Sequence, residues 1–395
     1  MSKVRKENSN ILVVISLASF ILVPVISTQE TASPEMPLVI LAMLPAFVAL
    51  ALKIVKVENR GYGLPTMLLC ASAFVSTLFS RYSEVDIRML KYILFAVYFV
   101  LMSSIVFSEK NVKFVIYIYI TASIVLAILI ILSMIFGYPH VDSMFYQGRY
   151  SIGITGMYKN PNYITSFINI GYFFVLYKFV TDKKKYSQKM AQVIVLLTFI
   201  IAMYFSGTRA ALLTAIITTI LVFFTRRESN KILIIGSLFF AFAMAFFVYS
   251  ENIAYLYDNF MGHRGSFEDV ERAETWLFAF DKIIESPILG YGLFGWGNIP
   301  GTAKYMMFIH NIYIELLVSQ GLWGILLFIY LFFNRIKKCT PDKKNFVYIF
   351  MFVNSFPLMF QNGFVEANFW RFMIINSVIV NYCEYAKSAM RKSIY

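Results

Sequence analysis

Charged residues are scarce in this chain. Of its 395 residues, 14% carry a charge and 59% are hydrophobic, whereas a soluble globular domain has about 25% charged residues. The mean hydropathy is +0.68. This composition excludes an ordinary soluble domain. Continuous apolar runs of about 17–25 residues recur, and each is long enough to cross a hydrocarbon core of about 30 Å as a helix.

Cysteine and histidine are also rare, with three of each. Cys70 falls within a predicted span, while Cys339 and Cys383 fall on the predicted cytoplasmic side, so we expect no disulfide. The histidines are scattered, without carboxylate or thiol partners at the spacing of metal ligands. We therefore expect no metal site and no cofactor.

The apolar runs predict an all-α polytopic membrane protein with about twelve transmembrane helices and both termini in the cytoplasm. Most of the 35 Lys and Arg residues then lie inside, as in "TDKKKYSQK", which agrees with the positive-inside rule. The net charge of +13 is thus expected to meet anionic membrane lipids rather than nucleic acid. The predicted spans are 10–27, 35–52, 64–80, 90–107, 114–136, 162–177, 190–206, 209–225, 232–250, 310–334, 345–362 and 367–385.

Two connections on the predicted outer side are long, at about 137–161 and 251–309, and loops of this length are often functional. Within the larger loop, "FEDVERAETWLFAFDKIIES" has helical periodicity and predicts an amphipathic helix along the outer interface. Since the first five spans carry few polar residues, we expect residues 1–136 to be a transmembrane scaffold. Residues 137–395, including loop 251–309, would form the catalytic region. The apolar stripe of the loop helix is Val270, Ala273, Leu277, Phe280 and Ile284.

Arg209, in "SGTRAALL", stands where one apolar run ends and the next begins. A charge at the bilayer centre costs about 3 kcal/mol, but the topology places Arg209 in a tight turn at the outer membrane edge. It is either an interfacial anchor or a phosphate ligand, because a guanidinium binds phosphate oxygens bidentately. Other cations on the outer side go against the charge bias and favour the second hypothesis. They are Arg149, Lys159, Arg264, Arg272 and Arg371.

The motif "HNIYIELLVSQGLWG" places His310 and Asn311 at the outer end of a span. Histidine is suited to accept a proton from a hydroxyl nucleophile, although a hydrogen-bonding role at the helix end is the alternative. Arg272 and Trp276 are four residues apart and share a helix face, which suits a structural pair or a substrate contact. "YKNPNYI" predicts a turn that begins a span at Asn162. "GYGLFGWG" lacks the Lys-Ser/Thr of a phosphate-binding loop, so we expect a flexible or tightly packed lining.

In this order, "SGTRAALL", "RAETWLFAFDKIIESPILGYG" and "HNIYIELLVSQGLWG" resemble the O-antigen ligase and polymerase superfamily, with "GMYKNPN" as a weaker match before them. The resemblance implies metal-independent transfer of a glycan from undecaprenyl pyrophosphate to a sugar hydroxyl, at the periplasmic face of the bacterial inner membrane. It implies that His310 is the base and that Arg209 and Arg272 bind the pyrophosphate. The expected substrate-binding residues are Arg264, Arg149, Lys159, Asn162, Asn311, Arg371 and Trp276.

Polymerase and ligase share this donor and differ in acceptor, which is another lipid-linked repeat unit or the lipid A core. We favour the polymerase because the chain is rich in Phe, Tyr, Ile and Lys, a composition typical of variable glycan clusters. A chain-length regulator is then an expected partner. A flippase or sugar transporter is the competing class. It is disfavoured because no internal repeat is visible and the polar candidates gather at one face. A non-catalytic scaffold would leave the outer arginines unexplained.

Overall fold

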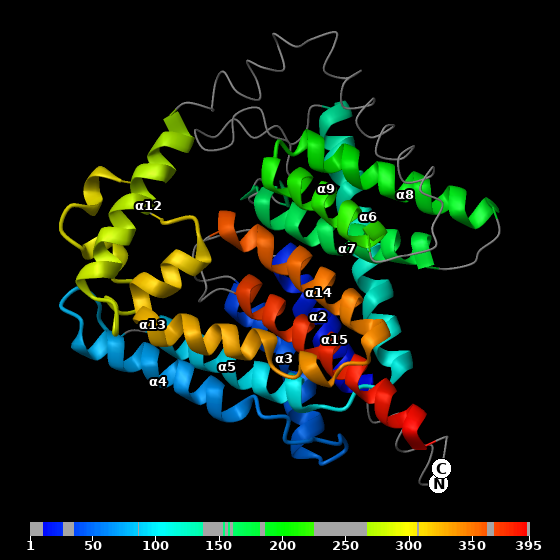
Figure 1. Cartoon of the computed structure of the whole chain (residues 1–395), viewed down its shortest axis with the longest axis horizontal. Helices are drawn as coiled ribbons and strands as arrows, with labels where there is room; N and C mark the ends of the chain where they lie inside the picture. The colour runs from blue at the N-terminus through cyan, green and yellow to red at the C-terminus, as the bar shows by residue number, and fades with distance from the viewer. Residues whose placement is uncertain are drawn as a thin grey trace.

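The protein is a bundle of helices in the computed structural model (Figure 1). The structure describes residues 11–26, 35–85, 87–136, 153–154, 157–158, 161–181, 186–224, 267–305, 308–361 and 367–392. A helix occupies each predicted span except 232–250, which lies outside the described residues. The long helices are α2 (Ile11–Ile26), α3 (Glu35–Ala51), α4 (Gly63–Phe79), α5 (Ile87–Ser104), α6 (Glu109–Phe136), α7 (Pro161–Thr181), α8 (Tyr186–Phe205), α9 (Arg209–Phe224), α12 (Phe267–Glu285), α13 (Ile312–Phe333), α14 (Pro341–Ser355) and α15 (Ala367–Lys392).

Short elements connect some of these helices. The strands β1 (Gly153–Ile154) and β2 (Met157–Tyr158) form a small antiparallel hairpin just before α7. One-turn 3₁₀ helices follow α12 and α13, and the longer η5 (Phe356–Phe360) follows α14. Helix α7 begins at Pro161, one residue before the predicted start at Asn162, because proline is tolerated in the first turn of a helix.

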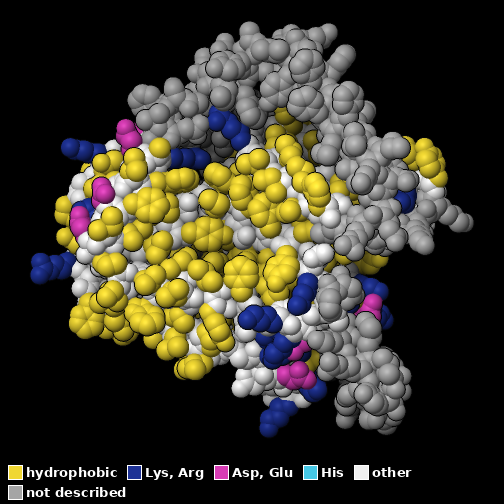
Figure 2. Space-filling model, viewed as in Figure 1, with side chains coloured by type: hydrophobic (Ala, Val, Ile, Leu, Met, Phe, Trp, Pro, Cys, Tyr) yellow, Lys and Arg dark blue, Asp and Glu magenta, His cyan; other side chains and the backbone are white. Residues whose placement is uncertain are grey.

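Several helices are long and apolar enough to belong to a membrane protein. Among the described residues, α6, α7, α8 and the stretch Ile312–Lys338 are long and apolar enough to cross a bilayer, and four shorter apolar helices accompany them. Figure 2 shows hydrophobic side chains across the middle of one face, with charged side chains gathered toward its ends. The helical membrane class is therefore confirmed, while the count of twelve spans and the side of the termini stay predictions.

One apolar core runs through the bundle, from Val13 in α2 to Cys383 in α15. Helix α4 packs on α13, α5 packs on α15, and α7 packs on α6, α8 and α9. Stacked rings tie α7 to α14, with centroids of Phe174 and Phe350 5.5 Å apart. The N-terminal helices thus share their core with the later ones, and the division at residue 136 stays a prediction about function.

Helix α13, which covers most of the predicted span 310–334, is interrupted at Gly321. Gly321 has φ 63° and ψ −158°, which is not helical. Glycine adopts such angles without a steric penalty. A Cβ at this position would also meet the carbonyl group of Ile288. The sequence analysis did not anticipate this break, because the break depends on a segment that is distant in sequence.

That segment, residues 287–293, lies against the break and pairs with its backbone. Tyr291 N donates to Val318 O at 2.7 Å, and Gly292 N donates to Ser319 O at 2.9 Å. Leu322 N donates in return to Pro287 O at 2.8 Å. A buried backbone group without a hydrogen-bond partner costs free energy, so irregular backbone in the interior must be paired within the protein. The packing of the "GYGLFGWG" stretch agrees with the tightly packed alternative of the prediction.

Helix α4 and the turn after it hold the same segment from the opposite side. Thr77 Oγ1 accepts from Leu293 N at 3.1 Å, and Ser72 Oγ donates to the buried Gln320 of α13 at 2.8 Å. The sequence analysis assigned α4 to a plain scaffold and missed this ladder. The sequence feature that could have indicated these contacts is the four-residue spacing of Ser72, Ser76 and Ser80, which is typical of residues on one helix face. The serines that donate to backbone oxygens of residues 289–293 are Ser76, Ser80 and Ser83.

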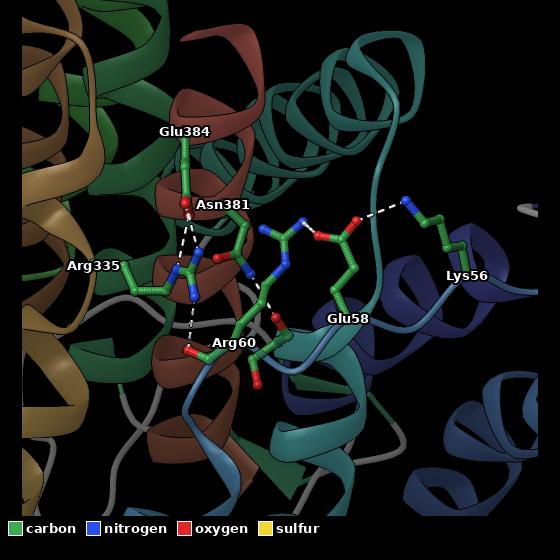
Figure 3. A network of polar contacts seen from close by, with 7 residues as sticks. Lys56, Glu58, Arg60, Arg335, Asn381 and Glu384 are labelled. Atoms are coloured by element: carbon green, nitrogen blue, oxygen red, sulfur yellow. Dashed lines mark hydrogen bonds and ion pairs between the residues drawn. The ribbon is translucent and has the colours of Figure 1, made fainter. Parts of the chain in front are cut away.

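An ion-pair network fixes the other end of α13 (Figure 3). Arg335 donates through Nε and Nη2 to the two carboxylate oxygens of Glu384 in α15, at 2.8 and 2.5 Å. Its Nη1 donates to the carbonyl of Arg60 at 3.1 Å, and Arg60 pairs with Glu58 at 3.2 Å. A bidentate arginine–carboxylate pair fixes orientation as well as distance. Helix α13 is therefore held at its break and at its end.

We predict that Gly321→Ala destabilises the protein, because alanine at positive φ costs about 1–3 kcal/mol and its Cβ displaces the Ile288 carbonyl. Thermal unfolding of the purified protein, followed by size-exclusion chromatography, should show a lower melting temperature. Gly297→Ala is the control, since a Cβ at Gly297 meets nothing within 4 Å. Equal melting temperatures for the two variants would contradict the proposed role of the break.

Candidate active site

His310 lies directly before α13, at the end of the bundle where α7, α9, α13 and α15 begin. We call this the site end. The N-cap of α13 is the buried Asn311, whose Oδ1 accepts from Tyr313 N at 3.0 Å and Ile314 N at 3.2 Å. His310 has φ 53°, a left-handed conformation that histidine enters more readily than most residues. The carboxamide oxygen of Asn311 thus serves the cap, and its role toward substrate stays a prediction.

Helix α12 runs across the ends of α4 and α13 at the site end (Figure 1). Trp276 Nε1 donates to the carbonyl of Ile309 at 2.8 Å, so α12 is tied to the residue next to His310. Ala279 is fully buried, and Ile283 packs against the same small apolar cluster. Trp276 therefore has a structural role, while the predicted Arg272–Trp276 pair and the substrate contact of Trp276 stay predictions.

The apolar stripe predicted for α12 points away from the protein. Leu277, Phe280 and Ile284 are 66%, 48% and 76% exposed, while the opposite face packs on α13. A helix that packs on one face and presents apolar side chains on another suits the membrane interface. The interfacial position stays a prediction.

The structure places Arg272 within electrostatic reach of His310. Burial, the larger cause, and the positive charge of Arg272 together lower the pKa of His310 to about 4. The imidazole is therefore neutral at pH 7, with a nitrogen lone pair that can accept a proton. The ring centroid of Phe308 lies 6.1 Å away, edge to face. Two of the three predicted catalytic residues thus form one local site.

Arg209 is the first residue of α9, after a tight turn that begins when α8 ends at Phe205. Gly207 has φ 64° in this turn, so the predicted tight "SGTR" turn is confirmed. Thr208 and Ala210, on either side of Arg209, line a small cavity together with Asn162 of α7. The structure therefore places Asn162 near the turn that carries Arg209.

The elements that carry Arg209 and His310 flank η5. Tyr313, in the first turn of α13, donates its hydroxyl to Ser355 O at 2.8 Å, directly before η5. At the other end of η5, Gln361 Nε2 donates to Asn162 O at 3.2 Å. Helices α9 and α13 both pack on η5. Their first turns therefore lie at the same end of the bundle, with η5 between them.

The remaining predicted residues are placed differently or lie outside the described chain. Arg371 is 5% exposed, with its guanidinium 5.1 Å from the ring centroid of Phe167, so it is enclosed by helices rather than displayed on an open surface. Its contact with substrate stays a prediction. Arg149, Lys159 and Arg264 lie outside the described residues. Within the described chain, no three His, Cys, Asp or Glu side chains gather as a metal site would require.

With this geometry in place, the chain can be compared with known protein families. Residues 194–329 match the family model described as O-Antigen ligase. This part of the chain is therefore similar to that family. The matched region runs from α8 into α13 and so contains Arg209, Arg272, His310 and the segment paired with Gly321. Members of this family are glycosyltransferase-like enzymes. Asn162 and Arg371 lie outside the matched region, and no curated protein matched the chain.

We predict that Arg272→Gln raises the pKa of His310, because it removes a nearby positive charge that disfavours the imidazolium. Burial remains, so the value should stay below the ordinary value of about 6.5. NMR titration of isotope-labelled histidines can measure it, since the chain has three and His310→Ala assigns the signal.

Lys282→Gln is the matched control, as it removes a charge from the same helix. Lys282 pairs with Glu285 at 2.6 Å and is not among the causes that lower the pKa of His310. An unchanged titration midpoint in Arg272→Gln would contradict the closeness of the two side chains.

Proposed function

We propose that this chain transfers a glycan from an undecaprenyl pyrophosphate carrier to the hydroxyl of an acceptor sugar, at the periplasmic face of the bacterial inner membrane. The observation that carries the proposal is the neutral His310 beside Arg272, inside the region that matches the O-antigen ligase family. This pair offers a proton acceptor next to a cation that suits phosphate.

In the proposed reaction, the acceptor oxygen attacks the anomeric carbon of the donor sugar while the bond from that carbon to the phosphate oxygen breaks. The hydroxyl proton passes to His310, and the pyrophosphate leaves on its lipid carrier. Arg272 and Arg209 stabilise the negative charge that grows on the pyrophosphate. Direct displacement inverts the anomeric centre, and the chemistry requires no metal.

The charge of Arg272 has two opposite effects on this reaction. Without substrate it lowers the pKa of His310 and so weakens the base. A bound pyrophosphate adds negative charge near the same site, which favours the imidazolium and raises the pKa again. The base therefore becomes stronger when the donor is present, which fits a transferase that should not act without it.

We propose that the acceptor is another lipid-linked repeat unit, so that the chain acts as an O-antigen polymerase. The second candidate is a ligase that transfers the glycan to lipid A core, because the matching family model is described as a ligase. A host that lacks the gene distinguishes them by its surface glycan and its undecaprenyl-linked glycans. In that host, lipid A core that carries a single repeat unit indicates that the lost protein is a polymerase. Bare lipid A core, with long glycan left on the undecaprenyl carrier, indicates that it is a ligase. Repeat units trapped on the cytoplasmic face would contradict both candidates and indicate a flippase.

In that host, we predict that His310→Ala fails to restore the surface glycan while the protein remains in the membrane. Loss of a general base typically costs about 10²–10⁴-fold in rate. Near-normal glycan output would remove His310 as the base.

Arg209→Lys should also fail to restore the surface glycan, because lysine keeps the positive charge but cannot bind phosphate oxygens bidentately as a guanidinium does. Arg81→Lys, at an exposed arginine in the turn between α4 and α5, is the matched control and should restore normal glycan. Normal output from Arg209→Lys would reduce Arg209 to an interfacial anchor.

A further inference from the structure

Helix α7 presents a polar stripe to the start of α9. Asn162, Thr165, Ser166 and Asn169 follow one another at helical spacing and line the small cavity beside Arg209. Gln361, directly after η5, closes another side of this cavity. A polar stripe over two turns of a membrane helix is costly unless its groups find partners.

Asn169 differs from its neighbours in this stripe. The Thr165 hydroxyl donates to Pro161 O at 2.8 Å, and the Ser166 hydroxyl donates to Tyr163 O at 2.8 Å. Asn169 is 1% exposed, yet within the described chain neither atom of its carboxamide has a hydrogen-bond partner. Leaving a buried polar group unsatisfied costs about 1–3 kcal/mol. This cost indicates that the cavity is built to receive a polar ligand atom.

The charges around the cavity indicate whether that ligand is an anion or a cation. The first turns of α7 and α9 both line it, and a helix N-terminus carries a partial positive charge with backbone N–H groups available to anions. Arg209 lies between two lining residues, Thr208 and Ala210. None of the described lining residues is Asp or Glu. This surrounding favours an anion over a cation.

We propose that this cavity is an anion subsite that takes a phosphoryl oxygen of the polyprenyl pyrophosphate, with the Asn169 Nδ2 group as its donor. The inference rests on the proposed function and deepens it, because it adds α7 and Gln361, outside the matched family region, to the donor site. The cavity has room for about one water-sized group. A single phosphoryl oxygen therefore enters it, while the phosphorus stays near the α9 turn.

Asn169→Asp tests the subsite, because a carboxylate repels a phosphoryl oxygen but still binds a water molecule. Ser166→Asp is a second variant at a partly exposed wall of the same cavity, where a carboxylate disturbs folding less. Asn376→Asp is the matched control. Asn376 is a buried amide of α15, 3% exposed, whose Nδ2 donates to Phe332 O at 3.2 Å.

The measurement is the affinity of each purified variant, in nanodiscs, for undecaprenyl diphosphate. Undecaprenol, which lacks phosphate, and inorganic pyrophosphate serve as competitors. We expect Asn169→Asp and Ser166→Asp each to weaken binding about tenfold or more, equivalent to about 1.4 kcal/mol, while Asn376→Asp binds like wild type. Competition by pyrophosphate but not by undecaprenol would place the recognition at the phosphates.

Wild-type affinity in both cavity variants would overturn the subsite and show that the cavity holds water or only packs helices. Equal weakening by Asn376→Asp would overturn it as well, since the effect would then be general. If the subsite fails while His310→Ala still abolishes glycan transfer, the proposed function stands. A wild-type protein that binds no undecaprenyl diphosphate would overturn both.

Discussion

The pairing of backbone groups at the break in α13 is the constraint on which the rest of the site depends. A break in a buried part of a helix leaves N–H and C=O groups that must be satisfied within the protein. Residues 287–293 supply those partners and are held in turn by hydroxyls of α4 and the turn after it. Because this segment directly follows α12, the pairing fixes α12 against α13. The bond from Trp276 to the Ile309 carbonyl then sets Arg272 beside His310.

The geometry explains why distant motifs occur together in this sequence. "SPILGYG" and "SQGLWG" are the two halves of one backbone interaction, with glycines where a Cβ would meet the facing backbone. Arg272 precedes the first half on α12, and His310 precedes the second half, directly before α13. A change in either glycine motif would therefore disturb the catalytic pair without touching it. The first turns of α7 and α9 complete the same end of the bundle, where the donor phosphates are proposed to bind.

Much of the helical framework could be predicted from the sequence, because long apolar runs in a membrane have one stable backbone form. The turn before Arg209 and the start of α7 at Pro161 followed from local chemistry. The break at Gly321 could not be predicted, because its partner lies about thirty residues earlier in the chain and only tertiary packing joins them. The regular spacing of serines in α4 and the turn after it can be seen in the sequence, but their hydrogen bonds could not be predicted without knowing that residues 289–293 lie beside them. The enclosure of Arg371 beside Phe167 could not be predicted either, since helix position alone does not reveal which side a residue faces.

The central claim is that the chain itself transfers glycan from a lipid-linked donor to a sugar hydroxyl. The most direct measurement is the release of undecaprenyl diphosphate by the purified wild-type protein in nanodiscs, with lipid-linked repeat units as donor and acceptor. The account predicts release that depends on the acceptor and matches the number of glycosidic bonds formed. Intact donor with no new glycosidic bond, or donor merely moved between leaflets in sealed vesicles, would contradict it.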